Sequence, residues 1–302
     1  MRKLLRSLTQ QERLNFLLTN RIPRRYMTML MGWYSKIESP WLTRFSIAIW
    51  RMFTDDLDLS EAKKQRYNSL HECFIRELKD GSRPINSAPD TVVSPCDAII
   101  GACGKIEGTT VYQAKDFPYE LSDLIPDKTL QQKYCNGFFV TLRLKSSMYH
   151  RFHAPIDCKI QEITYISGDT WNVNPVALKR IEKLYCKNER AVIELMLQHN
   201  YHSKNDIKQY VTQGAPSITL VPVAAILVAS MKFHCLDKQL DINYRGPNRL
   251  SCQVSYHKGD EIGYFQHGST IIVFSDQKFR LWECIQEGKR IKMGEPLLKY
   301  AS

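Results

Sequence analysis

The sequence of 302 residues has no hydrophobic run long enough to cross a bilayer. Its longest apolar stretch, residues 219–231, contains 13 residues and is interrupted by Pro222. Because a membrane-spanning helix needs about 20 apolar residues, this stretch predicts a buried segment of the core. Any attachment to a membrane is therefore expected to be peripheral.

The sequence also lacks paired cysteines. None of its nine cysteines forms a C-x-x-C pair, which argues against a zinc ribbon or a thioredoxin-like site. Their odd number and irregular spacing, without a secretory signal, predict isolated and mostly reduced thiols. Low-complexity tracts and a G-x-G-x-x-G motif are missing too, which argues against disorder and against a dinucleotide-binding fold.

Acidic residues are scarce in the first 53 positions, which hold ten lysines and arginines against two glutamates. This segment carries +8 of the formal net charge of +11. Apolar and aromatic residues recur at helical spacing in residues 27–34 and 42–53, which predicts two amphipathic helices. Such helices either lie in a membrane interface or pack as a hairpin on their own domain. The candidates for membrane contact are Arg24, Arg25, Trp33, Phe45 and Trp50.

From about residue 91 the sequence changes to short strand-like runs separated by turn residues. The predicted strands are residues 138–144, 159–166, 191–197, 271–274 and 279–284, and the clearest helical pattern between them is residues 177–185. This pattern predicts an α+β protein, with a helical region over residues 1–85 and a mainly antiparallel β body over residues 86–302. Two similar segments, KGDEIGYF (258–265) and KMGEPLLKY (292–300), suggest a small two-fold β-sandwich-like element near the C-terminus.

Two histidines three residues apart follow the first predicted strand and flank an arginine. His150 and His153 form a plausible acid–base pair because imidazole titrates near neutral pH. Their spacing would also suit a metal, but Arg151 between them and the lack of nearby ligands argue against one, so no metal is predicted. A purely structural role for the pair remains open.

Two further places combine groups that could take part in catalysis. Asp97 ends the turn Ser94-Pro95-Cys96-Asp97, where an aspartate either bonds its own backbone or orients a histidine. Gly268-Ser269 precedes a predicted strand. It is either a plain turn or a site where a serine hydroxyl, deprotonated by a histidine, attacks the unhindered glycine carbonyl.

Taken in order, these segments resemble the phosphatidylserine decarboxylase family over nearly the whole chain. The matching segments are Gly32-Trp33, Trp41-Leu42-Thr43, residues 74–79 (FIRELK), Arg83-Pro84-Ile85, Pro95-Cys96-Asp97, residues 149–155 (YHRFHAP), Asn172-Val173-Asn174, Asn188-Glu189-Arg190 and Gly268-Ser269-Thr270. Their common order and spacing are far more specific than any one motif.

The resemblance implies a proenzyme that cuts itself between Gly268 and Ser269. His153 would deprotonate Ser269, Asp97 would fix His153, and Ser269 would attack the Gly268 carbonyl to give an ester. Elimination and hydrolysis would then leave a β chain of residues 1–268 and an α chain of residues 269–302. The α chain would begin with a pyruvoyl group made from Ser269.

The implied reaction converts phosphatidylserine to phosphatidylethanolamine and CO2 through a Schiff base on the pyruvoyl group, which accepts the electrons left by decarboxylation. His150 would protonate the resulting carbanion, and Arg151 would attract the substrate phosphate or carboxylate. The implied partners are phosphatidylserine in an anionic membrane surface and the two chains as a heterodimer, with further dimerisation open. The expected location is the cytoplasmic face of a bacterial inner membrane, with a mitochondrial inner membrane as the alternative.

Three positions depart from the family pattern: Ala98, Met148 and His267. None of them removes a group of the proposed triad. Two other classes of function remain as alternatives. A serine hydrolase would keep Ser269 as its nucleophile, although the usual G-x-S-x-G motif is absent. A non-catalytic lipid-binding or partner-binding protein would keep the fold without the chemistry.

Overall fold

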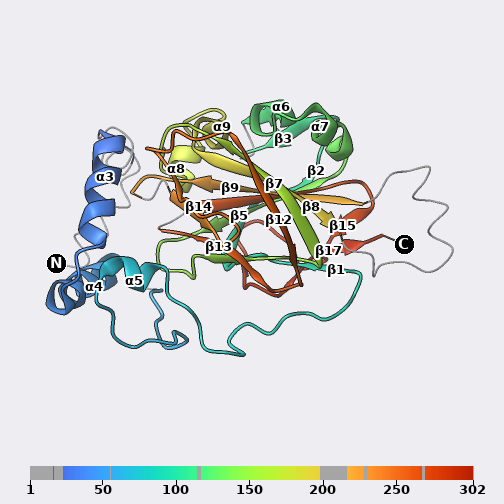
Figure 1. Cartoon of the computed structure of the whole chain (residues 1–302). Helices are drawn as coiled ribbons and strands as arrows, with labels where there is room; N and C mark the ends of the chain where they lie inside the picture. Colours follow the sequence, from blue (N-terminus) through green and yellow to red (C-terminus); the bar gives the residue numbers. More distant parts are fainter. Residues whose placement is uncertain are drawn as a thin grey trace.

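The computed structural model describes residue 16 and residues 23–54, 56–113, 117–197, 216–227, 230–266 and 269–301. At its centre is an eight-stranded, wholly antiparallel sheet (Figure 1). Its strands, in spatial order, are β12 (Arg249–Tyr256), β7 (Cys158–Ile166), β8 (Arg190–Leu197), β9 (Ser217–Ala224), β14 (Ser269–Ser275), β5 (Phe138–Leu144), β2 (Ala98–Lys105) and β16 (Arg290–Ile291).

Strands β9 and β14 lie in the middle of this sheet, and every residue of both is buried. Both are rich in β-branched residues and are covered on both faces, so their sequences are continuously apolar rather than alternating. Strand β9 contains Pro222 and the first six residues of the long apolar stretch, 219–224, all of them buried, which confirms the prediction of a core segment. The strands predicted at 138–144, 159–166, 191–197 and 271–274 are confirmed within one or two residues at each end.

Two small sheets cover one face of the central sheet. One contains β11 (Leu240–Asp241), β10 (Ser230–Phe233), β13 (Glu261–Phe265) and β6 (Arg151–His153), and the other contains β1 (Thr91–Val93), β17 (Pro296–Tyr300) and β15 (Phe279–Leu281). The larger core lies between the layers. There Leu142 and Ile271 of the central sheet pack with Phe152 and Phe265 of the four-stranded sheet. This face of the central sheet is called the sandwich face below.

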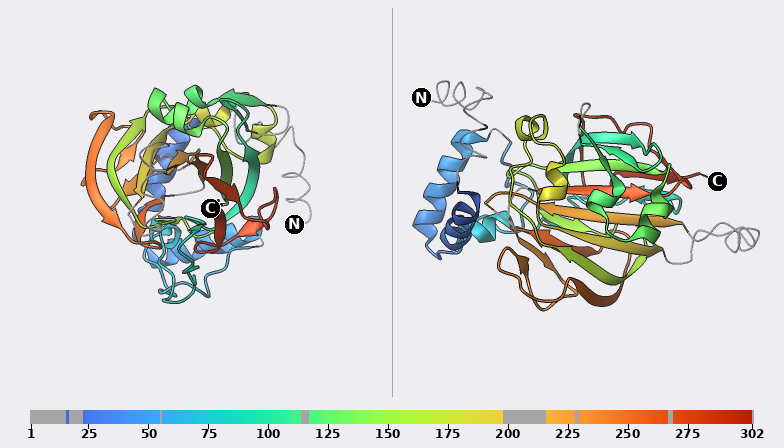
Figure 2. Two further views of the ribbon diagram at one scale, coloured as in Figure 1. Left: turned by 90° about the vertical axis from the view of Figure 1, so that its right-hand side faces the viewer. Right: turned by 90° about the horizontal axis from the view of Figure 1, so that it is seen from above.

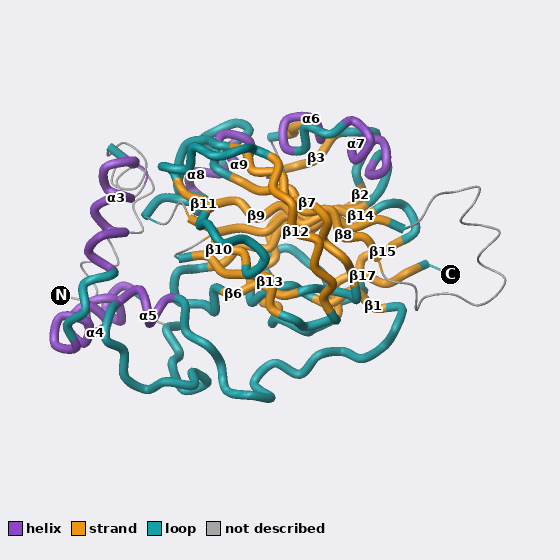
Figure 3. The backbone as a smooth tube through the Cα atoms, viewed as in Figure 1, coloured by secondary structure: helices purple, strands orange, loops and turns teal. Residues whose placement is uncertain are grey.

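The opposite face of the central sheet packs against short helices and a hairpin, and is called the helical face below. These elements are β3 (Thr110–Tyr112), β4 (Pro118–Glu120), α6 (Leu121–Leu124), α7 (Lys128–Tyr134), α8 (Pro175–Leu178) and α9 (Leu184–Lys187) (Figure 3). The single helix suggested over residues 177–185 is wrong, because α8 and α9 are separate. Lys183 adopts a left-handed backbone conformation with φ 51°, which an α-helix of L-residues does not continue through.

Three helices lie at one end of the central sheet (Figure 2): α3 (Arg24–Ser35), α4 (Pro40–Phe53) and α5 (Leu70–Phe74). Helix α4 begins at a favourable N-cap, since the Ser39 hydroxyl accepts from the Leu42 amide and Pro40 occupies the first helical position. The two predicted N-terminal helices are therefore confirmed. No helix within the described ranges is long and apolar enough to cross a bilayer.

Helices α3 and α4 expose their apolar side chains and bury small polar ones. The exposed large apolar side chains are Tyr26, Met29, Leu30, Trp33, Trp41, Phe45, Ile49 and Phe53. The buried positions of the two helices are Thr28, Ser35, Thr43 and Ser46. Their hydroxyls are bonded across the packed face, as between Tyr34 and Ser46 and from Thr43 to the Asn68 carbonyl. This inside-out distribution leaves a contiguous apolar surface without a protein partner in the described structure.

The two similar C-terminal segments form equivalent turns on opposite sides of one loop. Gly259 and Gly294 both have positive φ, 95° and 89°. A Cβ at Gly259 would approach the Ile85 side chain to 2.1 Å, and one at Gly294 would approach the Pro84 carbonyl oxygen to 2.5 Å. The strands that follow these turns, β13 and β17, lie in the two different small sheets of the sandwich.

One cysteine prediction needs correction. Cys235 and Cys252 are joined by a disulfide, with Cα atoms 5.4 Å apart, while seven cysteines are free. The sequence spacing of 17 residues gave no sign of this pair. The pair forms because the chain after β10 returns beside β12, which is a tertiary contact.

Candidate active site

Ser269 stands where the chain passes from the small sheet into the central one. Strand β13 ends at Phe265 and β14 begins at Ser269, which pairs with Leu144 of β5 and Ala224 of β9. Ser269 is fully buried, and its hydroxyl has no hydrogen-bond partner among the described residues. Gly268 and His267 lie outside the described residues. The Ser269 hydroxyl is therefore not held by a hydrogen bond to the turn or to the strand, although Ser275 of the same strand also has a buried hydroxyl without a described partner.

Strand alternation defines the face on which Ser269 lies. Side chains of directly paired residues point to the same face of a sheet. Ser269 therefore shares the sandwich face with Ile271 and Leu144, both of which belong to the larger core. Thr270 and Arg143, which pair with each other, lie on the helical face.

His150 is held against the same crossover. Its carbonyl oxygen accepts a 3.0 Å hydrogen bond from the Phe265 amide, four residues before Ser269. The ring is fully buried, packs edge-on against Phe74 and has no hydrogen-bond partner at either nitrogen within the described ranges. Burial, with the nearby Arg76 cation, lowers the pKa of His150 to about 3. At neutral pH the ring is therefore neutral, with one nitrogen able to donate and the other able to accept.

His153 has both ring nitrogens occupied. Nδ1 lies 2.8 Å from the Gly259 carbonyl oxygen, and Nε2 lies 3.0 Å from the Tyr149 hydroxyl. Since a carbonyl can only accept, Nδ1 carries the proton, and Nε2 of the neutral ring accepts from Tyr149. Burial lowers the pKa of His153, although the bond to Gly259 opposes this. The ring is thus fixed in the tautomer in which Nε2 is basic.

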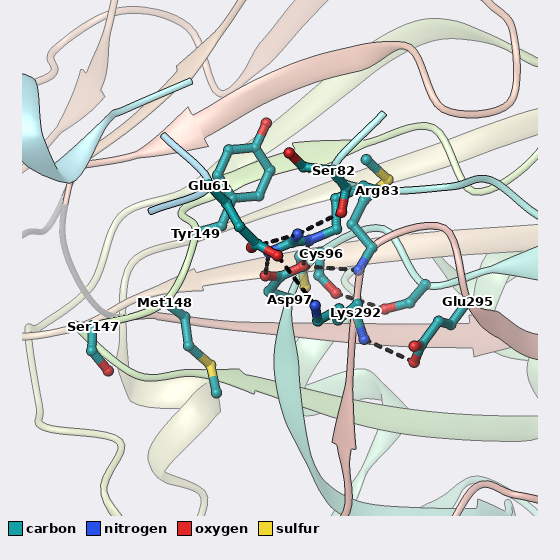
Figure 4. A network of polar contacts seen from close by, with 12 residues as sticks. Glu61, Ser82, Arg83, Cys96, Asp97, Ser147, Met148, Tyr149, Lys292 and Glu295 are labelled. Atoms are coloured by element: carbon teal, nitrogen blue, oxygen red, sulfur yellow. Dashed lines mark hydrogen bonds and ion pairs between the residues drawn. The ribbon is translucent and has the colours of Figure 1, made fainter. Parts of the chain in front are cut away.

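Asp97 does not contact His153, which corrects the predicted arrangement. Its carboxylate receives Arg83 Nε at 2.8 Å and Nη2 at 2.6 Å, together with the Met293 amide at 2.9 Å. Figure 4 shows Arg83 between Asp97 and Glu61, to which Arg83 Nη1 donates at 2.7 Å. A guanidinium that binds both oxygens is a strong partner for a carboxylate, so in the uncleaved chain the Asp97 carboxylate is already bound to Arg83. The backbone of His153 is still close, because its amide donates to the Pro95 carbonyl at 2.8 Å.

Arg151, predicted to attract the substrate, is already paired. Its Nη1 donates to both oxygens of Glu261 at 2.8 and 3.0 Å, and its Nε donates to the Ile75 carbonyl. Arg76 of the FIRELK segment is also buried and engaged, since it donates to the carbonyls of Ser147 and Met148. Arg76 thereby fixes the loop that leads to the Tyr149-His150 segment.

Glu189 is a buried acid that the sequence did not mark as functional. Its amide and carbonyl are bonded to Asp169 and Ala224, and its carboxyl group interacts with the Tyr165 hydroxyl. Arg190 pairs with Val223 on the helical face, so Glu189 points to the sandwich face, in line with Ala224 and Ser269. Burial raises the pKa of Glu189 to about 8. The only sequence signal for this acid is its place in the Asn188-Glu189-Arg190 segment.

A cavity of about 920 Å³ opens between the N-terminal helices and this end of the central sheet. Its apolar wall includes Ile49, Phe53 and Phe74 of α4 and α5. The opposite wall includes Leu144, which pairs with Ser269, and Ala225, which follows Ala224, the other strand partner of Ser269. This volume is in the range of small-molecule binding sites.

The predicted membrane-contact residues divide into two groups. Trp33 and Phe45 are 65% and 63% exposed on the apolar surface, and Arg25 is also exposed. Arg24 instead forms a 2.6 Å ion pair with Asp169 and stacks over Trp171, while Trp50 stacks on Phe74 and lines the cavity. Arg24 and Trp50 are thus held by contacts within the protein, whereas Trp33, Phe45 and Arg25 face outward.

Comparison with known proteins identifies the family of this chain. The profile of the family described as phosphatidylserine decarboxylase matches residues 70–299. A phosphatidylserine decarboxylase proenzyme of Haemophilus influenzae is 31% identical over 281 residues, covering 91% of this chain and 92% of the relative. One of Brevibacillus brevis is 29% identical over 285 residues, covering 93% and 95%. The chain belongs to the phosphatidylserine decarboxylase family.

Proposed function

We propose that this chain is a proenzyme that converts phosphatidylserine to phosphatidylethanolamine and CO2 after cutting itself between Gly268 and Ser269. The observation that carries the proposal is the state of Ser269 within a chain of this family. The Ser269 hydroxyl is fully buried and has no partner among the described residues. Ser269 is also the first residue of a central strand, and its strand partner Leu144 lines a large cavity.

The maturation step uses groups of this chain alone. The Ser269 hydroxyl attacks the Gly268 carbonyl carbon, and the peptide C–N bond gives way to an ester. Elimination breaks the ester C–O bond and releases a β chain that ends in the Gly268 carboxylate. Water then replaces the nitrogen of the new α-chain terminus, ammonia leaves, and a pyruvoyl group remains. His153 Nε2, basic in the fixed tautomer, is the proposed acceptor of the serine proton, relayed by Tyr149, which bonds to it.

The pyruvoyl group fits this position because residue 269 is buried at the cavity end of β14, with no competing partner for its oxygen in the described structure. When present, the group supplies the electron sink that decarboxylation requires. His150 has a neutral, fully buried ring that can hold a proton, and its backbone carbonyl is bonded to Phe265 of the same crossover. Its proposed role is to deliver a proton to the substrate carbon after CO2 leaves.

Intact mass spectrometry of the purified protein beside Ser269→Ala tests the maturation. The expected result is two chains, one ending at Gly268 and one of 34 residues with a blocked pyruvoyl terminus, and a single full-length chain for Ser269→Ala. A serine hydrolase would instead remain intact and react with a serine-directed probe. An intact and unreactive chain without decarboxylase activity would favour a non-catalytic lipid-binding protein.

We also propose that the apolar surface of α3 and α4 binds the enzyme peripherally to an anionic membrane, in a bacterium the cytoplasmic face of the inner membrane. The support is the inside-out distribution of side chains, with Trp33, Trp41 and Phe45 all more than half exposed. Aromatic and apolar side chains of this kind enter the lipid interface. Substituting these three by Gln is expected to abolish sedimentation with anionic liposomes. The control variant substitutes Gln for Ile85 and Met196, two exposed apolar residues outside these helices. Equal sedimentation of the test and control variants would reject the proposal.

A further inference from the structure

Arg143 is a basic residue of the cavity that is not paired within the described structure. It is the penultimate residue of β5, pairs with Thr270 of β14, and lines the cavity on the helical side of the sheet end. No hydrogen bond or ion pair joins its guanidinium to another described residue, and its Nε is fully enclosed. Burial lowers the pKa of Arg143, so the enclosed cation is destabilised where it stands.

The other two basic side chains of the cavity are already paired with an acid. Lys145 and Arg290 both bind Asp56, with distances of 2.8 and 2.6 Å to the same carboxylate oxygen. Ser147 donates to the second oxygen of Asp56 at 2.7 Å. With this one acid shared between two cations, the cavity keeps an excess of positive charge. A desolvated guanidinium without a counter-ion is costly unless an anion completes the site.

The position of Arg143 indicates which anionic group of phosphatidylserine, the carboxylate or the phosphate, it would bind. In phosphatidylserine the amine and the carboxylate are on the same carbon, so a substrate whose amine reaches residue 269 holds its carboxylate there too. The phosphate is separated from that carbon by the serine methylene and an ester oxygen. Arg143 is the cross-strand partner of the next residue, Thr270, and faces away from the Ser269 side chain. Arg143 therefore lies in the cavity but away from the position of the amine and the carboxylate, which leaves the phosphate as the anion for it.

The remaining walls fit the rest of a glycerophospholipid. Ile49 and Phe53 line the cavity and are also exposed on the apolar surface of α4. This surface continues outward to Phe45 and Trp41, where acyl chains would remain in contact with the membrane. The guanidinium fork matches two oxygens of a phosphodiester in a bidentate arrangement.

We propose that Arg143 is the residue that binds the phosphodiester of the phospholipid substrate. The inference rests on the proposed decarboxylase function, and it assigns the headgroup contact to a side chain outside the histidine-containing segment. It also gives the site a way to retain both substrate and product, since phosphatidylethanolamine keeps the phosphate and lacks the carboxylate.

Calorimetric titration with short-chain phosphatidylethanolamine tests the assignment without turnover. The chains compared are Ser269→Ala and Ser269→Ala with Arg143→Met, Arg143→Lys or, as a control, Arg249→Met on the exposed edge of β12. Arg143→Met is expected to weaken binding about ten- to hundredfold, as for loss of a charged hydrogen bond. Arg143→Lys should weaken it less, and the control should leave it unchanged.

Kinetics of the cleaved enzymes separate the two anions. For Arg143→Met we expect KM for phosphatidylserine and the inhibition constant of phosphatidylethanolamine to rise by similar factors, with a smaller change in kcat. A rise in KM without a change in product binding would assign Arg143 to the carboxylate and overturn the proposal, as would unchanged binding in both experiments. If Arg143→Met does not fold, equal product binding by Arg143→Lys and the parent overturns it. An unsubstituted chain that binds the lipid but never decarboxylates would defeat the proposed function and leave the phosphate site standing.

Discussion

Three buried charged or titratable side chains behave differently at this site because their partners differ. Asp97 is satisfied by Arg83 and the Met293 amide, and His153 by Gly259 and Tyr149. Glu189 has no cationic partner of this kind, and burial raises its pKa despite the nearby Tyr165 hydroxyl. Burial alone therefore does not define a group's chemistry, which depends on what each polar atom meets.

Glu189 is expected to make stability depend on pH. Its pKa rises from an ordinary value of 4.5 in the unfolded chain to about 8 in the folded one, so folding favours the protonated form. Stability falls as pH rises through this window, by up to about 1.4 kcal/mol per pH unit, and levels off above it. Glu189→Gln should therefore raise the melting temperature relative to the parent more at pH 8.5 than at pH 5. Glu162→Gln, at a largely exposed position, is the control. A difference independent of pH would contradict this account.

Arg83 is expected to contribute strongly to stability. Its side chain and that of Asp97 are only 7% and 12% exposed, so removing the guanidinium leaves a buried carboxylate with the Met293 amide as its remaining partner among the described residues. Breaking such a pair typically costs about 3–5 kcal/mol. We expect Arg83→Met to lower the free energy of unfolding by about 3 kcal/mol in urea titrations. Lys64→Met removes the Lys64–Glu72 pair, whose lysine is 68% exposed, and should cost far less because solvent screens the pair. Equal effects would show that burial does not strengthen the Arg83 pair.

At the scale of elements, the strands were easier to predict than the short helices. Alternating or continuous apolar runs bounded by turn residues define β5, β7, β8 and β14 locally. The helical pattern of residues 177–185 fails because the chain must turn at Lys183 to cover the sheet. The N-terminal helices were predictable from periodicity, but the direction in which their apolar sides point was not. That direction depends on what else covers the sheet end.

Two glycines with positive φ, Gly288 and Gly294, test the contact between the turn at Gly294 and the loop at Pro84. Gly288 and Gly294 have almost equal positive φ, 86° and 89°, but only Gly294 faces a close neighbour, the Pro84 carbonyl oxygen. Gly288→Ala should carry only the conformational cost of positive φ, about 1 kcal/mol. Gly294→Ala should destabilise the protein by at least about 1–2 kcal/mol more, because the clash adds to it. Urea titration of both variants measures the difference. Equal losses would mean that the Pro84 loop yields to the methyl group.

At the scale of the whole molecule, the proposed cut would divide the chain without dividing the fold. Strand β14 would belong to the 34-residue α chain, yet its neighbours β5 and β9 belong to the β chain. Strand β17 of the α chain likewise pairs with β1. These contacts are backbone hydrogen bonds and buried apolar side chains, which do not require an intact bond at residue 268.

The two chains are therefore expected to remain together after cleavage. Size-exclusion chromatography of the mature protein should give one peak containing both chains, which separate only in denaturant. After dilution from urea, Ser269→Ala should recover its native circular dichroism more completely than the mature protein, because one chain need not find another. Spontaneous loss of the α chain under native conditions would contradict the role assigned to β14.

The sequence by itself determined the family, the strands of the central sheet, the N-terminal helices and the position of Ser269, because each is encoded in local pattern or a contiguous motif. Tertiary structure alone decided that Asp97 pairs with Arg83, that Cys235 meets Cys252, that Trp50 turns inward, that Glu189 is buried and that Arg143 lines the cavity. These contacts join residues far apart in the chain. Their energies depend on which groups compete for each partner and on how much water is excluded, and neither is encoded in a local run of residues.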